Sequence, residues 1–331
     1  MFLFWIFLST YFITINSGNL NYTTVVTFGD SLTDTGNGYR LSFYTWPPVP
    51  PFNINGSYSD GLMWNQILTQ EYLNGATLHD FAYGCATTDS DLVQATMGYN
   101  PNIKANYSLR SNAKPPGVRQ QIDTYINLSI NQNIDFDRTL YVVWIGINNY
   151  FYAPNITPLE TVESMMESIN ILVFFGVRNL LIFNQPPFDR FPPYQSETTN
   201  ETKLLYLQHN EILANKLNHT YFTLHSRLNI RLFDCYTFMS KIINDYKLYG
   251  FENLDKCWDT ESSSTVLIQC NDIKKRIFAD EFHLTTAMQT LIAKQVYLVL
   301  GGSNVSSLGL KLISKTKYVI FIIIFAIFIF K

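Results

Sequence analysis

One segment, Thr23-Thr24-Val25-Val26-Thr27-Phe28-Gly29-Asp30-Ser31-Leu32, indicates the architecture of this chain. Its first six residues are β-branched or aromatic, which is typical of a strand buried in a parallel sheet. Gly29 and Asp30 then predict a tight turn, so Ser31 follows the carboxyl end of the strand. Open parallel sheets place their active sites along that edge, which makes Ser31 a candidate functional residue.

Similar apolar runs predict three more strands, at residues 139–145, 179–183 and 228–233. Helices are predicted at residues 161–174, 201–224 and 285–300. Strands that alternate with helices indicate an α/β fold with a parallel sheet covered on both faces. No repeat or low-complexity linker divides residues 19–302, so we expect a single domain there.

The composition limits the classes of function. The chain has 331 residues, 47% of them hydrophobic, which is enough for a large core. Charged residues make up 15% and the net charge is −3, so nothing resembles the basic face of a nucleic-acid-binding protein.

Residues 1–18 are predicted to be a secretory signal peptide. An apolar stretch opens the chain and becomes polar at Asn16-Ser17-Gly18, where we expect cleavage near Ser17 or Gly18. A buried strand or helix is the alternative interpretation of this stretch.

The opposite end, residues 303–331, contains an unbroken apolar run from Val319 to Phe330. As a helix this run would span about 18 Å, short of the roughly 30 Å of a bilayer's hydrocarbon core. Small residues at Gly301-Gly302-Ser303, a polar spacer and this run predict a GPI-attachment signal. A retained tail anchor is the alternative, and either one would attach the protein to a membrane.

Eight sequons for N-glycosylation support export to the cell surface or the medium. They begin at Asn21, Asn55, Asn106, Asn127, Asn155, Asn200, Asn218 and Asn304. Four cysteines, Cys85, Cys235, Cys257 and Cys270, permit three full disulfide pairings. We favour Cys257–Cys270, because it closes a short polar loop.

Two further motifs supply groups that Ser31 needs for chemistry. Gly146-Ile147-Asn148 follows a predicted strand, and Asp280-Glu281-Phe282-His283 precedes the last predicted helix. A serine hydroxyl becomes a nucleophile when a base takes its proton, and a carboxylate holds that base in the right tautomer. Acyl transfer also needs donors for an oxyanion, which the Ser31 N–H, the Asn148 amide and the loop at residues 80–86 can supply. The set predicts a serine esterase, in which the histidines outside these motifs, His79, His209, His219 and His225, are structural or solvated.

These motifs resemble the GDSL, or SGNH-hydrolase, esterase family, and within it the secreted acetylesterases of carbohydrate esterase family sixteen. The resemblance rests on residues 28–37, Ser59-Asp60-Gly61-Leu62-Met63-Trp64 and Gln185-Pro186-Pro187-Phe188-Asp189-Arg190. It continues in Tyr249-Gly250-Phe251, Cys257-Trp258 and Cys270, which adds support to the favoured disulfide. The resemblance implies a three-layer α/β/α flavodoxin-like SGNH-hydrolase fold.

The same resemblance implies roles for individual residues. Ser31 would be the nucleophile, His283 its base and Asp280 the residue that orients the base. Cys85 stands where the family has its oxyanion glycine, so its backbone N–H joins Ser31 and Asn148 in the predicted oxyanion hole. The family also has aspartate where this chain has Asn149.

Aromatic residues follow the first motif, and Tyr44, Trp46 and Phe52 are candidates for substrate binding. Their rings are predicted to stack on sugars, to line an acyl-chain groove or to cover the core. We expect a hydrolase that removes short acyl groups, such as acetyl, from small esters or acylated carbohydrates, with no metal or organic cofactor. The alternatives are a lipase or phospholipase that acts on longer chains, and an inactive surface protein that binds glycans.

Overall fold

The computed structural model describes residues 20–49, 51–97, 111–195, 200–224, 228–258 and 270–302. The predicted signal peptide, the C-terminal tail and the sequons at Asn106 and Asn304 lie outside these residues. Within the described residues, no helix is both long enough and apolar enough to cross a membrane.

Five parallel strands form the central sheet, in the spatial order β2-β1-β3-β4-β5. The strands are β1 (Thr24–Gly29), β2 (Thr77–Asp80), β3 (Thr139–Trp144), β4 (Asn179–Phe183) and β5 (Asn229–Phe233). This is the flavodoxin-like order of doubly wound sheets, so the predicted fold class is confirmed. The sequence did not predict β2, since this four-residue edge strand is only half buried and has no apolar run.

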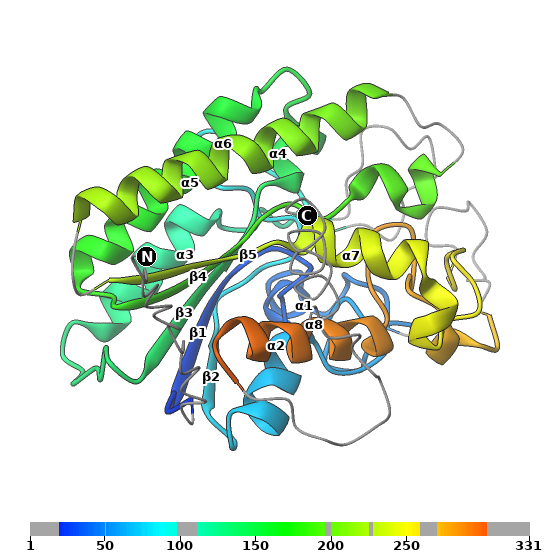
Figure 1. Ribbon diagram of the computed structural model, residues 1–331, viewed down its shortest axis with the longest axis horizontal. Coiled ribbons are helices and arrows are strands. Elements are labelled where there is room, and N and C mark those ends of the chain that lie inside the picture. Colours follow the sequence, from blue (N-terminus) through cyan, green and yellow to red (C-terminus); the bar gives the residue numbers. More distant parts are fainter. Residues whose placement is uncertain are drawn as a thin grey trace, which may run out of the picture.

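Helices cover both faces of the sheet (Figure 1). On one face lie α3 (Val118–Ser129), α5 (Pro158–Phe175) and α6 (Asn200–Leu224), which pack against residues such as Val143 and Ile182. On the other face lie α2 (Trp64–Ile67), α7 (Cys235–Asn244) and α8 (Thr286–Val299), which pack against Val142 and Leu181. The short helices α1 (Asn37–Leu41) and α4 (Ile147–Tyr152) follow β1 and β3 directly.

Local signals explain why α5 begins before the predicted residue 161. Thr157 accepts a hydrogen bond from Glu160 N at 3.2 Å, and Glu160 accepts one from Thr157 N at 2.9 Å. This capping box and Pro158 in the first turn start the helix three residues early. Gly176 ends it with φ of 109°, a left-handed conformation that glycine adopts without strain.

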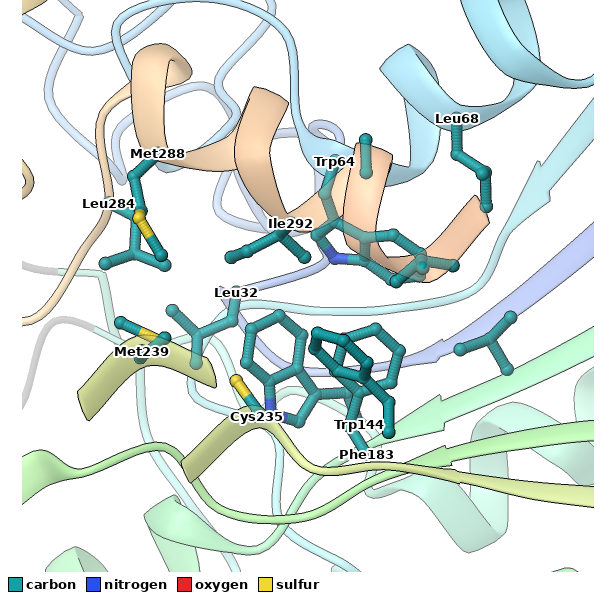
Figure 2. Packing of buried hydrophobic residues seen from close by; sticks show 14 of the residues in the cluster. Leu32, Trp64, Leu68, Trp144, Phe183, Cys235, Met239, Leu284, Met288 and Ile292 are labelled. Carbon is teal, nitrogen blue, oxygen red and sulfur yellow. The ribbon is translucent and has the colours of Figure 1, made fainter. Parts of the chain in front are cut away.

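The core under α2, α7 and α8 contains a group of aromatic rings among aliphatic side chains (Figure 2). The rings of Trp144 and Phe183 stack with centroids 4.6 Å apart, and Trp64 lies 4.9 Å from Phe183. Leu32 belongs to the same cluster and is 2% exposed. Burying a leucine contributes about 1.5–3 kcal/mol, so Leu32 anchors the turn that carries its neighbour Ser31.

Candidate active site

Ser31 lies on a turn at the carboxyl end of β1. The Asp30 carbonyl accepts hydrogen bonds from Thr33 N at 3.0 Å and from Asp34 N at 2.9 Å, which closes the turn. The Asp30 carboxyl accepts a bond from Leu32 N at 3.0 Å. Burial raises the pKa of Asp30 to about 7, although this bond and the His283 charge oppose the rise. Ser31 stays half-buried between two anchored neighbours.

His283 and Asp280 come from the segment between β5 and α8, and they complete a chain of hydrogen bonds with Ser31. His283 Nε2 lies 2.9 Å from Ser31 Oγ. His283 Nδ1 lies 2.8 Å from Asp280 Oδ2. Because a carboxylate accepts from Nδ1–H, Nε2 is left unprotonated and can take the serine proton.

The Asp280 carboxylate is held by its own turn. It accepts backbone hydrogen bonds from Phe282 N at 3.0 Å and from His283 N at 2.7 Å. Burial alone would raise the pKa of Asp280, but the His283 charge and these bonds together hold it below its usual value. Asp280 therefore stays ionised, which is the state that can accept from His283 Nδ1–H.

Asn148 enters the site from the first turn of α4. Its side-chain Nδ2 donates to the Ala86 carbonyl at 2.9 Å. An amide nitrogen carries two hydrogens, so the second one can serve a substrate oxygen. The bond also ties the loop after β3 to the loop after β2.

Cys85 lies in the loop after β2 with φ of 65°. A non-glycine residue in this left-handed region costs about 1–2 kcal/mol, which fits a position where the family resemblance implies glycine. The neighbouring Gly84 N donates to Asp34 Oδ2 at 2.7 Å, and Ala86 N donates to the Tyr83 carbonyl at 3.1 Å. These two bonds hold the loop on either side of Cys85, whose side chain is half-buried.

Asn149 joins the same two loops from inside the protein. It is fully buried, accepts a bond from Thr88 N at 3.0 Å and donates from Nδ2 to Thr88 Oγ1 at 2.8 Å. Ser164 Oγ in α5 also donates to Thr88 Oγ1, at 2.9 Å. The Asn149 amide therefore bonds to the backbone N–H and to the hydroxyl of Thr88 without a buried charge.

Asp34 is a supporting residue that the sequence interpretation missed. Its buried carboxylate accepts four backbone hydrogen bonds, from Gly36, Asn37, Gly38 and Gly84, at 2.6–2.9 Å. The first three fix the start of α1, and the fourth fixes the Cys85 loop. The available signal was its place in the first motif, three residues after Ser31.

The predicted aromatic residues take different places. Phe52 is 4% exposed, and its ring lies edge-on to His283 with centroids 5.8 Å apart. Tyr58, which the sequence interpretation did not single out, lies closer to His283, at 4.8 Å. Trp46 is half-buried against the cluster that contains Phe52, whereas Tyr44 is 64% exposed.

The predicted disulfide Cys257–Cys270 is confirmed. Cys257 packs with Phe52, Tyr58 and Trp258 beside His283. The disulfide therefore stabilises the cluster of side chains that packs against the imidazole. Cys235 is buried in the core, and neither it nor Cys85 forms a disulfide. Within the described part of the chain, no cluster of three His, Cys, Asp or Glu side chains could hold a metal ion.

Comparison with known proteins identifies the family. The profile described as GDSL-like Lipase/Acylhydrolase matches residues 25–296, which is most of the chain. The chain therefore belongs to the GDSL-like lipase/acylhydrolase family, whose members include esterases and acetylesterases.

The chain is similar to two relatives with different names. The thermolabile hemolysin of Vibrio parahaemolyticus is 24% identical over 82% of this chain and 62% of its own length. The acetylesterase of Thermothelomyces thermophilus is 29% identical over 58% of this chain and 64% of its own. The match thus spans less than two thirds of each relative. A solved GDSL-family lipolytic protein from Veillonella parvula aligns with TM-score 0.46 and 13% identity, over 83% of this chain and 96% of its own.

Proposed function

We propose that this protein is a serine carboxylic-ester hydrolase in which Ser31 is the nucleophile. The observation that carries the proposal is the hydrogen-bonded chain from Ser31 Oγ through His283 to the Asp280 carboxylate. Its distances of 2.9 and 2.8 Å lie within the range that proton transfer requires. Membership of the acylhydrolase family supports the same chemistry.

The reaction proceeds in two halves. Ser31 Oγ attacks the ester carbonyl carbon while its proton passes to His283 Nε2, and the carbonyl electrons move onto the oxygen. When the tetrahedral intermediate collapses, the bond to the alcohol breaks and His283 gives that alcohol the proton. A water molecule then attacks the acyl-serine in the same way, which releases the acid and restores Ser31.

The developing oxyanion needs donors, and we assign three groups to this role. They are the backbone N–H groups of Ser31 and Cys85 and the second hydrogen of the Asn148 amide. The Asn148–Ala86 bond supports this assignment, because it holds the side-chain donor beside the Cys85 loop. Such donors act in the transition state without having to reorganise.

We infer that the preferred substrates carry short acyl groups, such as acetyl esters of carbohydrates. Cys85 places a side chain where the family has glycine, which narrows the space for an acyl group. The acetylesterase relative supports this choice.

Exposed apolar side chains favour a second candidate, hydrolysis of longer-chain lipid esters. Phe43 is 86% exposed, Tyr44 64% and Ile54 81%. They lie on adjoining turns, since the Tyr44 ring meets Tyr39 at 5.3 Å and Gly56 packs on Tyr39. The relative named as a hemolysin is consistent with lipid substrates.

A series of p-nitrophenyl esters from acetate to octanoate separates the two candidates. A groove that accepts the chain gains about 0.8 kcal/mol for each methylene, so a lipase should improve steadily with chain length. We expect kcat/KM to be highest on acetate and to fall towards octanoate, and Cys85→Gly to reduce that fall. A profile that rises through octanoate would favour the lipid substrates.

We also propose that the protein is exported and glycosylated. All six sequon asparagines in the described residues are exposed: Asn21, Asn55, Asn127, Asn155, Asn200 and Asn218. Removing N-glycans enzymatically from the protein made in a eukaryotic secretory pathway should lower its mass. An unchanged mass would contradict the proposal.

A further inference from the structure

A buried histidine outside the catalytic chain contacts the segment that carries Asn148. We propose that His209 is a positioning residue, which holds the Gly146–Asn148 turn so that the Asn148 amide reaches the oxyanion. This inference rests on the proposed function and deepens it. His209 is in α6 and is 0% exposed, so it does not contact substrate directly.

His209 bonds to both sides of the turn. Its Nδ1 lies 2.7 Å from Tyr150 Oη, and Tyr150 follows Asn148 by two residues in α4. Its Nε2 lies 3.3 Å from Gln185 Nε2, which donates to the Ile145 carbonyl at 2.6 Å. Ile145 and Tyr150 bracket the turn, so the imidazole is connected to each end of it.

The contacts define one protonation state of His209. Because the Gln185 amide nitrogen only donates, His209 Nε2 must accept, and the remaining proton is on Nδ1 and points to Tyr150. Burial lowers the pKa of His209 to about 3, so the ring is neutral at physiological pH. A neutral imidazole offers one donor and one acceptor, as these two partners require.

Gln185 itself is fixed before it meets the histidine. Its backbone N donates to Asn210 Oδ1 at 2.8 Å, and its carbonyl accepts from Asn210 Nδ2 at 3.0 Å. Asn210 follows His209 directly, so one turn of α6 both carries the imidazole and holds Gln185, the residue whose amide contacts it. The connection therefore runs from a long helix to the active-site loop with little freedom.

The turn packs directly on this pair. Gly146 has φ of 133°, and a Cβ there would lie 2.7 Å from Gln185 Nε2 and 3.0 Å from His209 Cε1. The backbone at Gly146 therefore rests against the imidazole. A change in that ring shifts the turn, and with it the amide that must meet the oxyanion; an error of about 1 Å in such a group can cost 100-fold in rate.

The test is a set of double-mutant cycles on a p-nitrophenyl acetate assay, with thermal unfolding as the check of folding. His209→Phe keeps an aromatic ring and removes both bonds, while Tyr150→Phe removes one hydroxyl only. We expect kcat to fall about 10- to 100-fold for His209→Phe and about 3- to 10-fold for Tyr150→Phe, with KM nearly unchanged. Introduced into Asn148→Ala, each should lower kcat by less than about twofold, because the donor that it positions is gone.

Tyr125→Phe is the matched control. It breaks another buried hydroxyl contact, that of Tyr125 Oη with Tyr141 Oη at 2.8 Å. Tyr141 lies in β3, five positions before Gly146 on the chain. We expect this variant to change kcat by less than about twofold in either background.

Equal losses of kcat in the wild-type and Asn148→Ala backgrounds, for either variant, would overturn the positioning role. So would wild-type kcat in a folded Tyr150→Phe enzyme. Failure of the proposed function would give a different result. The wild-type chain would then not hydrolyse p-nitrophenyl acetate, or Ser31→Ala would hydrolyse it as fast as wild type, before any cycle is run. If His209→Phe does not fold, the Tyr150→Phe cycle alone decides.

Discussion

The two halves of the proposed site, the nucleophile half and the oxyanion half, are assembled in different ways. Ser31 and the pair Asp280/His283 lie on two short turns, and each turn is closed by hydrogen bonds within a few residues. The oxyanion half instead depends on contacts between residues far apart in sequence, such as Asn148 with Ala86 and Gly84 with Asp34. Each side chain of the nucleophile half is therefore oriented by its own turn, although Ser31 and His283 meet only in the folded chain. The Asn148 and Cys85 donors depend on contacts between distant loops.

This difference has a physical consequence for mutations. Removing a reacting group deletes a chemical step, so the loss is large and independent of the surroundings. Removing a supporting contact only displaces a donor. The loss of kcat is therefore smaller, and it depends on whether that donor is present. The rate losses caused by substitutions in the two halves should thus differ in size, and also in whether they add when two substitutions are combined.

The largest effect should come from the nucleophile half. His283→Ala removes the base, and we expect kcat to fall by about 10⁴- to 10⁶-fold with the protein still folded. Initial rates on p-nitrophenyl acetate measure the loss, and circular dichroism checks the fold. A folded variant with a tenth of the wild-type rate would exclude His283 as the base.

A smaller loss is expected in the oxyanion half. Asn148→Ala deletes one donor, which should lower kcat by about 100- to 1,000-fold and change KM little. Its loss should be smaller than that of His283→Ala in the same assay. Normal turnover by Asn148→Ala would place that amide outside the oxyanion hole.

The buried histidine should also affect the pH dependence of stability. The unfolded chain protonates His209 below about pH 6.5, whereas the folded chain keeps it neutral down to about pH 3. The free energy of unfolding therefore falls as the pH drops through this window. Denaturant unfolding at several pH values should give a shallower acid decline for His209→Phe than for wild type, and equal slopes would contradict the burial of a neutral ring.

The smallest effect concerns Cys85. Cys85→Gly relieves the left-handed strain and should raise the free energy of unfolding by about 1 kcal/mol, less than the full strain because glycine gains freedom in the unfolded chain. Cys85→Ala keeps the strain and is the control. If the two variants are equally stable, backbone strain at this position does not lower the free energy of unfolding.

The same division explains which features could be predicted from the sequence. The sequence predicts strands β1 and β3 because both are buried and rich in β-branched or aromatic residues, whereas β2 (Thr77–Asp80) is only half-buried and lacks that pattern. Ser31 and His283 are candidates from the sequence alone because a serine hydroxyl and an imidazole are the groups that the proposed reaction needs. His209 acts through contacts that exist only after the chain has folded, so composition and spacing do not indicate it. Asp34 acts in the same way, and its place in the first motif is the one signal that points to it.

The central claim is that Ser31 attacks the ester. Its side chain is half-buried on a turn that backbone bonds and Leu32 already hold, so Ser31→Ala should leave the fold intact. A phosphonate ester that labels active-site serines should modify the wild-type chain at Ser31, which mass spectrometry of its peptides can locate.

The most direct measurement is kcat/KM of wild type and Ser31→Ala on p-nitrophenyl acetate, with matched thermal unfolding. The account predicts ester hydrolysis by wild type and a loss of about 10⁴-fold or more in the variant, at an unchanged melting temperature. Substantial hydrolysis by a folded Ser31→Ala protein would contradict it.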